Sequence, residues 1–215
     1  MIYNQSRRYS DRKSLYTQQR KPRVHEEHGI VLDFLQHGHL SDPSRRPVAQ
    51  IIGVEHLSLL EVAPKKGVFL KPLEKVYIGI EKREKIHHIT KKINFNDLTE
   101  TAKIALEDLI KESINKSVDK IIELFNKAGP ISTRQHQLEL IPGIGKKHMW
   151  AIIEEREKRP FGNLEDLKAR VPSTPNPLNA VIKRAIEELE GVDKYQIVLP
   201  RLNLKEIESI KTQDS

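Results

Sequence analysis

The most constraining feature of the sequence is a glycine-containing turn between two apolar, helix-like stretches. The segment reads LELIPGIGKKHMWAIIEER over residues 138–156. Gly143 and Gly145 permit a sharp main-chain turn and the close approach of another molecule, because no Cβ stands in the way. Ser132 and Gln135 have the spacing of a capping box, which predicts that the first helix begins there. The segment therefore predicts two short helices joined by a tight turn.

The start of the second helix predicts an anion-binding site. A helix N-terminus leaves backbone N–H groups without intrahelical acceptors, and the positive end of the helix dipole lies behind them. Two lysines at the first helical positions add full positive charges. The residues that we predict to bind phosphate are Pro142, Gly143, Ile144, Gly145, Lys146, Lys147 and His148.

This turn and its apolar frame resemble the helix-hairpin-helix motif, which binds nucleic-acid phosphates without reading bases. In proteins with that motif a monovalent cation often lies between hairpin carbonyls and a phosphate. The resemblance implies a K⁺ or Na⁺ ion at the carbonyls of Ile141 and Gly143. An ordinary helical turn that ends in glycine is the simpler alternative, and the apolar residues on both sides of the turn argue against it.

Positive charge is concentrated at the N-terminus. The chain has 215 residues, 37 Lys and Arg, 30 Asp and Glu, and a net charge of +7. Residues 1–24 hold seven of the basic residues and one acid, so the remaining 30 basic and 29 acidic residues nearly cancel. Residues 1–23 lack apolar periodicity, which predicts a disordered basic tail. Its cations and interspersed tyrosines suit contact with nucleic acid, although a merely solubilising tail is the alternative. The tail residues that we predict to bind nucleic acid are Arg7, Arg8, Arg12, Lys13, Arg20, Lys21 and Arg23.

Residues 24–95 show short runs of β character. Apolar residues alternate over 30–34 and 48–52, and they form compact runs over 57–62 and 76–80. Turn-rich pieces separate these runs, which predicts a small antiparallel barrel of the OB-like type. A basic run, KREKIHHITKK, overlaps the end of this region. It is either a solvated face or a second phosphate-binding patch of Lys82, Arg83, Lys85, Lys91 and Lys92.

The rest of the chain predicts helices. Residues 96–130 keep helical spacing and predict one long connecting helix. Residues 131–191 predict a helix-hairpin-helix domain, with Asn163 as an N-cap and Gly191 as a helix end. Its second hairpin is degenerate, because the connecting segment VPSTPNP contains prolines, which have no backbone N–H to offer a phosphate. Residues 192–215 predict a C-terminal strand and a tail. The fold class is therefore α+β, an OB-like barrel followed by a helical domain.

The stretch from about residue 29 to residue 170 resembles an archaeal family that is thought to bind RNA and is known as a domain of unknown function, family 655. The residues that carry the resemblance are VLDFL at 31–35, YIGIEKREKIHHI at 77–89, FNDLT at 95–99 and FNKAGPISTRQHQLELIPGIGKKHMWAIIEER at 125–156. The resemblance implies an OB-like N-terminal half, a helix-hairpin-helix C-terminal half, and an association with translation and ribosomal RNA maturation. It implies no reaction.

The sequence does not predict an enzyme. The chain has no cysteine, which excludes disulfides and thiolate chemistry. The histidines at 37, 39, 87 and 88 have no carboxylate at a ligand spacing, and no Walker loop is present. A glycosylase would need a catalytic residue downstream of the hairpin, where Lys158, Asp166 and Lys168 match only by chance. No apolar run approaches the roughly 18 residues of a membrane span, and no secretory signal is seen. We therefore expect a cytoplasmic protein with no membrane partner, no small-molecule substrate and no cofactor beyond the hairpin ion.

Together these patterns predict a non-enzymatic RNA-binding protein that contacts phosphates. The expected partners are ribosomal RNA and ribosomal proteins. The main alternative is a DNA-binding protein of repair, recombination or transcription, since helix-hairpin-helix units commonly bind DNA. A protein-interaction adaptor with a purely structural hairpin is the third hypothesis.

Overall fold

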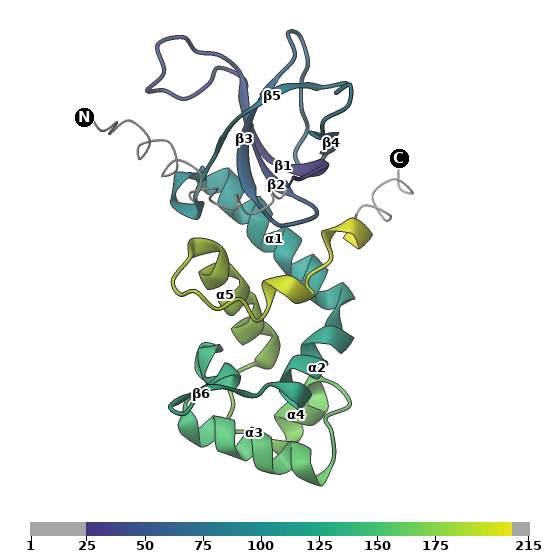
Figure 1. The fold of residues 1–215 in the computed structure, drawn as a ribbon, viewed down its shortest axis with the longest axis vertical. Helices are drawn as coiled ribbons and strands as arrows, with labels where there is room; N and C mark the ends of the chain where they lie inside the picture. Colours follow the sequence, from purple (N-terminus) through teal and green to yellow (C-terminus); the bar gives the residue numbers. More distant parts are fainter. Residues whose placement is uncertain (1–24, 208–215) are drawn as a thin grey trace, which may run out of the picture.

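A computed structural model describes residues 25–207 of the chain. The predicted disordered tail lies outside the described residues, and so do its seven candidate binding residues, from Arg7 to Arg23. Figure 1 shows an elongated molecule with the β-sheet at one end, helix α3 at the other and helix α1 between them.

The N-terminal half is a curled, five-stranded antiparallel half-barrel. The strand order is β4-β1-β2-β3-β5, which leaves β4 and β5 at the two edges. Ladder irregularities fall between Val31 and Asp33 in β1 and at two places between β3 and β5, and such bulges increase the local twist of a sheet. The strands are β1 (His28–Leu35), β2 (Val48–Gly53), β3 (Leu59–Pro64), β4 (Lys75–Tyr77) and β5 (Ile86–Lys92).

The two faces of the sheet bury different cores. The inner face encloses a small cluster that includes Val31, Ile51 and Val62. The outer face, with Ile30 and Leu32, joins a larger cluster that continues through α1 into the C-terminal helices. Because this larger core is continuous, the sheet and the helices pack against one another directly.

The predicted connecting helix is two helices in the structure, α1 (Glu100–Lys116) and α2 (Val118–Lys127), preceded by the 3-10 turn η1 (Phe95–Asp97). The prediction of one continuous helix over 96–130 is therefore wrong, because the helix is interrupted at Ser117. The Ser117 amide is shared between the carbonyls of Ser113 and Ile114, a tight turn that lets α2 change direction.

The prediction that a helix begins at Ser132 is wrong. Two short strands, β6 (Pro130–Ser132) and β7 (Gln135–His136), occupy that position, and a single 3-10 turn follows, η2 (Gln137–Leu140). The capping box uses His136 and Glu139 instead: Leu138 N donates to His136 Nδ1 at 3.1 Å, and His136 N donates to Glu139 Oε2 at 2.9 Å.

Three α-helices follow: α3 (Lys146–Lys158), α4 (Leu164–Arg170) and α5 (Pro177–Glu190). The Asn163 side chain caps α4 by accepting a hydrogen bond from Asp166 N, and α5 ends at Gly191 with a φ of 76°. Both features match the sequence prediction.

The described part of the C-terminal segment contains no strand, contrary to prediction. Residues 192–207 form loops and two 3-10 turns, η3 (Leu199–Arg201) and η4 (Leu204–Ile207). The reason is the buried carboxylate of Glu188, which accepts hydrogen bonds from the amides of residues 197–199. Buried Arg184 pairs with Glu188 at 2.9 Å and so balances its charge.

Candidate nucleic-acid interface

The predicted hairpin turn lies on the surface. Gly143 and Gly145 are both exposed, whereas Ile141 and Ile144 are buried in the core beneath them. Gly143 has a φ of 84°, in the left-handed region that only glycine adopts easily. A Cβ at Gly145 would meet no atom within 4 Å. The apolar residues therefore hold the turn in place while its glycines face solvent.

The amides at the turn are free to donate. Among residues 25–207, no hydrogen bond uses the N–H of Gly143, Gly145, Lys146 or Lys147. The Ile144 amide alone is used, by the carbonyl of Ile141 at 2.9 Å. The start of α3 thus presents a set of unpaired donors beside two exposed lysines, as an anion site requires.

Helix α3 begins in a way that is unfavourable for its own stability. Its N-cap is Gly145, which provides no side-chain acceptor, and its first turn carries Lys146 and Lys147 and no acid. Positive side chains at a helix N-terminus oppose the helix dipole. Each of the other four described α-helices has a capping side chain or an acidic residue in its first turn. A bound anion would compensate both deficits of α3.

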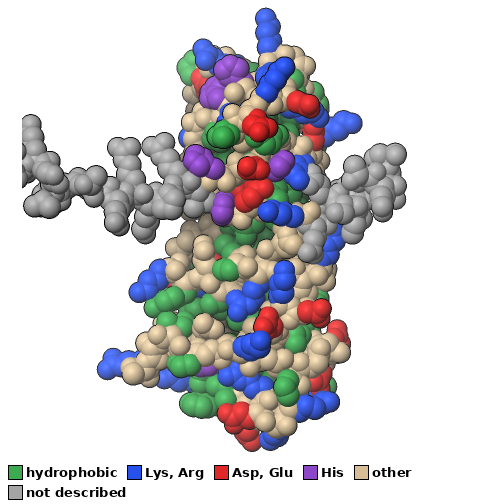
Figure 2. All heavy atoms as spheres, turned by 45° about the vertical axis from the view of Figure 1, so that its right-hand side comes forward, with side chains coloured by type: hydrophobic (Ala, Val, Ile, Leu, Met, Phe, Trp, Pro, Cys, Tyr) green, Lys and Arg blue, Asp and Glu red, His purple; other side chains and the backbone are tan. Residues whose placement is uncertain are grey.

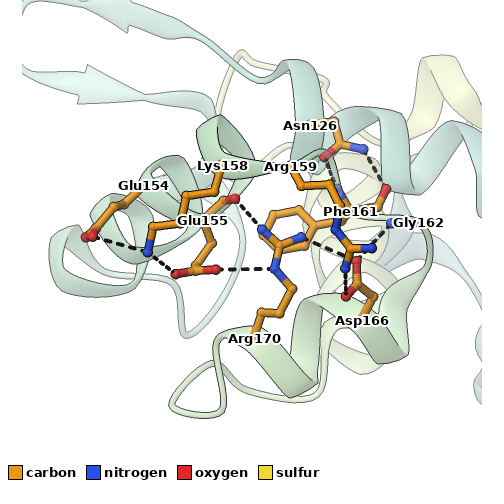
Figure 3. A network of polar contacts seen from close by, with 9 residues as sticks. All are labelled: Asn126, Glu154, Glu155, Lys158, Arg159, Phe161, Gly162, Asp166 and Arg170. Carbon is orange, nitrogen blue, oxygen red and sulfur yellow. Dashed lines mark hydrogen bonds and ion pairs between the residues drawn. The ribbon is translucent and has the colours of Figure 1, made fainter.

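The opposite end of α3 is held by a dense polar network, drawn in Figure 3. Glu155 pairs with Lys158 at 2.6 Å and with Arg170 of α4 at 3.2 Å, and the hydrogen bond from Lys158 lowers the pKa of Glu155. The Arg170 guanidinium lies 4.5 Å from the centre of the Phe161 ring. Asn126 of α2 exchanges two hydrogen bonds with the main chain of Phe161. These contacts fix the orientation of α3.

The predicted monovalent-cation site fits only in part. The carbonyl of Gly143 accepts a hydrogen bond from His148 Nδ1 at 3.0 Å, and that of Ile141 accepts one from Ile144 N. Each oxygen retains one further lone pair for an ion. A K⁺ or Na⁺ ion at Ile141 and Gly143 stays a prediction.

The second predicted patch lies in the sheet half of the molecule, apart from the hairpin. Its residues are on or beside β5, in the sheet, while the hairpin leads into α3 (Figure 1). Lys85 pairs with Glu74, and Lys91 Nζ lies 3.8 Å from Glu61. Arg83 donates to the carbonyl of Gly79. Lys82 and Lys92 are exposed. Only a long ligand could therefore contact both predicted patches.

Charges of both signs alternate over the face shown in Figure 2, and no extended area of one sign is visible there. The hairpin differs locally. Within the described part of the chain, Lys146, Lys147 and Arg134 have no carboxylate partner within 4 Å, whereas Lys158, at the other end of α3, contacts both Glu154 and Glu155. Cations without a carboxylate partner thus lie at the start of α3 and in the β6–β7 turn across the groove from it.

The sequence pattern did not predict two further residues of this region. Arg134, in the β6–β7 turn, and Trp150, on α3, both line a groove that also includes Lys146. Lys146 and Trp150 are four residues apart in a predicted helix, which places them on one face. This spacing could have indicated that Trp150 lies beside the predicted phosphate site. Arg134 gave no such signal, because its position depends on the unexpected β6–β7 pair.

Residues 25–207 meet neither the requirements of a three-ligand metal site nor those of a membrane-spanning helix. No group of three or more His, Asp or Glu side chains is arranged to hold a metal ion. His39 Nε2 contacts the buried Glu61 carboxylate at 2.5 Å, and the rings of His87 and His88 contact each other. No described helix combines the length and the apolar character that crossing a bilayer requires.

The structure thus defines an α+β protein in which an antiparallel half-barrel packs on helices that expose a cationic, uncapped helix start. The chain belongs to the family described as "Protein of unknown function (DUF655)", whose model matches residues 25–199. It is 37% identical over 199 residues to MJ0038 of Methanocaldococcus jannaschii, described as uncharacterized, covering 92% of this chain and 90% of that protein. The crystal structure of Af1531 from Archaeoglobus fulgidus is similar, with a TM-score of 0.67, 40% identity, and coverage of 81% of this chain and 99% of that one.

Proposed function

We propose that this protein binds RNA through its phosphate backbone and acts on the ribosome or in ribosomal RNA maturation, without catalysing a reaction. The observation that carries the proposal is the start of α3. Exposed Gly143 and Gly145, free amides, and unpaired Lys146 and Lys147 occur together at one helix N-terminus. These groups match the charge and the hydrogen-bond acceptors of a phosphate.

The finer fold description belongs to the same proposal. We infer that the half-barrel is OB-like and that η2, the glycine turn and α3 form a helix-hairpin-helix unit. The strand order β4-β1-β2-β3-β5 and the short turn between η2 and α3 support these assignments. The segment between α4 and α5 would then be the second, degenerate hairpin, which supports the first turn and does not bind phosphate.

The patch around β5 and the N-terminal tail extend the proposed interface. Lys82 and Lys92 are exposed, Lys82 between β4 and β5 and Lys92 at the end of β5, near the last turn of α5. An RNA that contacted both the hairpin and the β5 patch would have to extend from the helices to the sheet, which suits a large folded RNA such as ribosomal RNA. The proposed partners are therefore ribosomal RNA and the ribosomal proteins around it, in the cytoplasm.

Binding assays with the full chain test the proposal. Fluorescence anisotropy would compare a labelled stem-loop RNA, a single-stranded RNA and a duplex DNA at two salt concentrations. We expect a preference for RNA and a steep loss of affinity with salt. Equal or tighter binding to duplex DNA would instead identify a DNA-binding protein, and failure to bind any of the three would leave an adaptor.

A pair of matched double variants locates the contact. Replacing Lys146 and Lys147 by alanine should reduce the slope of log affinity against log salt by roughly 1 to 2, because two phosphate contacts are lost. The control replaces Lys127 and Lys158, which are paired with glutamates on their own helices. Its slope should match that of the unmodified protein.

A further inference from the structure

A groove lies directly beside the proposed phosphate site. It has a volume of about 430 Å³ and runs between one face of α3 and the β6–β7 turn. Lys146, Trp150 and Ile153 form the α3 wall, and residues 132–136 with Arg134 form the other. Because Lys146 belongs both to this groove and to the hairpin, a ligand held at the turn would reach the groove without a gap.

The groove contains an aromatic side chain that the fold does not use. Trp150 is 63% exposed, although the neighbouring Met149 is 5% exposed and packs in the core. It is the chain's single tryptophan. A large aromatic surface left in water is costly unless a ligand covers it, and a flat indole is well suited to stacking on another ring.

Charge indicates what kind of ligand fits. Arg134 and Lys146 have no carboxylate partner among the described residues, so the groove carries two available cations. The one acid in the lining, Glu139, is engaged by the amide of His136 at 2.9 Å. The groove therefore suits a ligand that combines a flat apolar part with negative charge.

We propose that this groove binds an unpaired base of single-stranded or looped RNA, with the base stacked on Trp150 and its flanking phosphates held by Arg134 and Lys146. The inference rests on the proposed function and names its substrate class. Stacking on one aromatic side chain is sequence-tolerant, since every base has a π face. A base inside a regular duplex is already stacked, so the groove would favour RNA with unpaired nucleotides.

An apolar peptide is the competing occupant. It would cover Trp150 and Ile153 equally well, but it would leave Arg134 and Lys146 without partners. The two unpaired cations, one on each wall of the groove, therefore favour a nucleotide.

The single tryptophan gives a direct test, because its fluorescence reports only on position 150. The full chain would be titrated with a single-stranded oligoribonucleotide, a perfectly paired RNA duplex, and a strand of the same length in which every residue is abasic. Anisotropy of a label on each nucleic acid would measure binding independently. We expect the single strand to quench the tryptophan and the abasic strand to bind without quenching.

Variants complete the test. Trp150→Ala should weaken single-strand binding about 5- to 100-fold and leave duplex binding nearly unchanged, while Trp150→Phe should retain part of the affinity. Binding to all three nucleic acids without quenching, and with no effect of Trp150→Ala, would overturn the groove proposal and leave the phosphate-binding proposal intact. No binding in any arm would overturn the proposed function itself.

Discussion

Gly143 and Pro175 touch across the two turns of the helical region. A Cβ added to Gly143 would lie 3.0 Å from Cγ of Pro175, which is closer than such atoms normally approach. The proline-rich loop between α4 and α5 is therefore packed against the glycine turn that precedes α3. Thr174 is buried next to it, and its Oγ1 donates to the carbonyl of Val171 at 2.7 Å. A loop that is poor in N–H donors thus contributes by fixing the shape of the turn that has them.

This contact separates the roles of the two glycines. Gly143→Ala should lower the free energy of unfolding by about 1–3 kcal/mol, because it places a Cβ at positive φ and against Pro175. Gly145→Ala meets open space and should cost about 1 kcal/mol at most, through poorer N-capping. Urea denaturation of both variants checks the order. Equal losses would contradict the observed packing.

The unusual start of α3 predicts a conflict between stability and binding. Gly145→Asp should raise the free energy of unfolding by about 1 kcal/mol, because the carboxylate caps α3 and complements its dipole. The same carboxylate would occupy the proposed anion site, so we expect RNA affinity to fall by about tenfold or more. Asn163→Asp is the matched control, since it makes the same charge at the N-cap of α4. A stabilised Gly145→Asp variant that still bound RNA normally would argue against this site.

Acidification should destabilise the hairpin through His136. Burial, together with the nearby Arg156 charge, lowers the pKa of His136, and its Nδ1 must be unprotonated to accept from Leu138 N. The unfolded chain therefore binds a proton more readily, and stability falls as the pH drops below about 6.5. Thermal unfolding between about pH 7.5 and 5 would show a steeper loss for the unmodified protein than for His136→Asn, which keeps a neutral capping acceptor. Parallel curves would exclude His136 as the cause.

The buried ion pair that anchors the C-terminal segment predicts a large loss of folding stability when one of its two side chains is replaced by alanine. Arg184 and Glu188 have side chains that are 3% and 0% exposed, and Arg184 also contacts Asp193. Arg184→Ala would leave a buried carboxylate without its cation and should cost about 3 kcal/mol or more. Lys127→Ala breaks an exposed pair and should leave the free energy of unfolding almost unchanged. Chemical denaturation distinguishes the two, and similar losses would refute the assignment.

Local signals predicted the fold where local chemistry decides it. Asn163 and Gly191 were identified because a capping side chain and a left-handed glycine act within a few residues. Ser132 shows the limit of such local signals, because its capping-box spacing predicted a helix start where the structure has strand β6. Two capping-box patterns follow one another there, and the choice of His136 with Glu139 depends on the pairing of β6 with β7, which local spacing does not encode.

In the candidate site, too, the part made by contiguous residues could be predicted and the part made by distant residues could not. The glycine turn and its lysines are contiguous in the chain, so they could be predicted from the sequence. The groove could not, because Arg134 and Trp150 meet only after β6–β7 folds against α3. Likewise, only the tertiary structure shows that β5, which ends at Lys92, lies in the sheet and apart from the hairpin. Barrel closure also depends on long-range strand pairing, and the sheet of the described residues is an open half-barrel with β4 and β5 at its edges.

The most direct test of the account observes the hairpin amides themselves. Two-dimensional ¹H–¹⁵N NMR of the full chain, titrated with a stem-loop RNA that has unpaired loop nucleotides, would report on each N–H separately. The account predicts that the largest shift changes occur at Gly143, Gly145, Lys146 and Lys147, and that they are reversed by added salt. If RNA bound while these four amides kept their shifts, the contact would lie elsewhere and the central claim would be wrong.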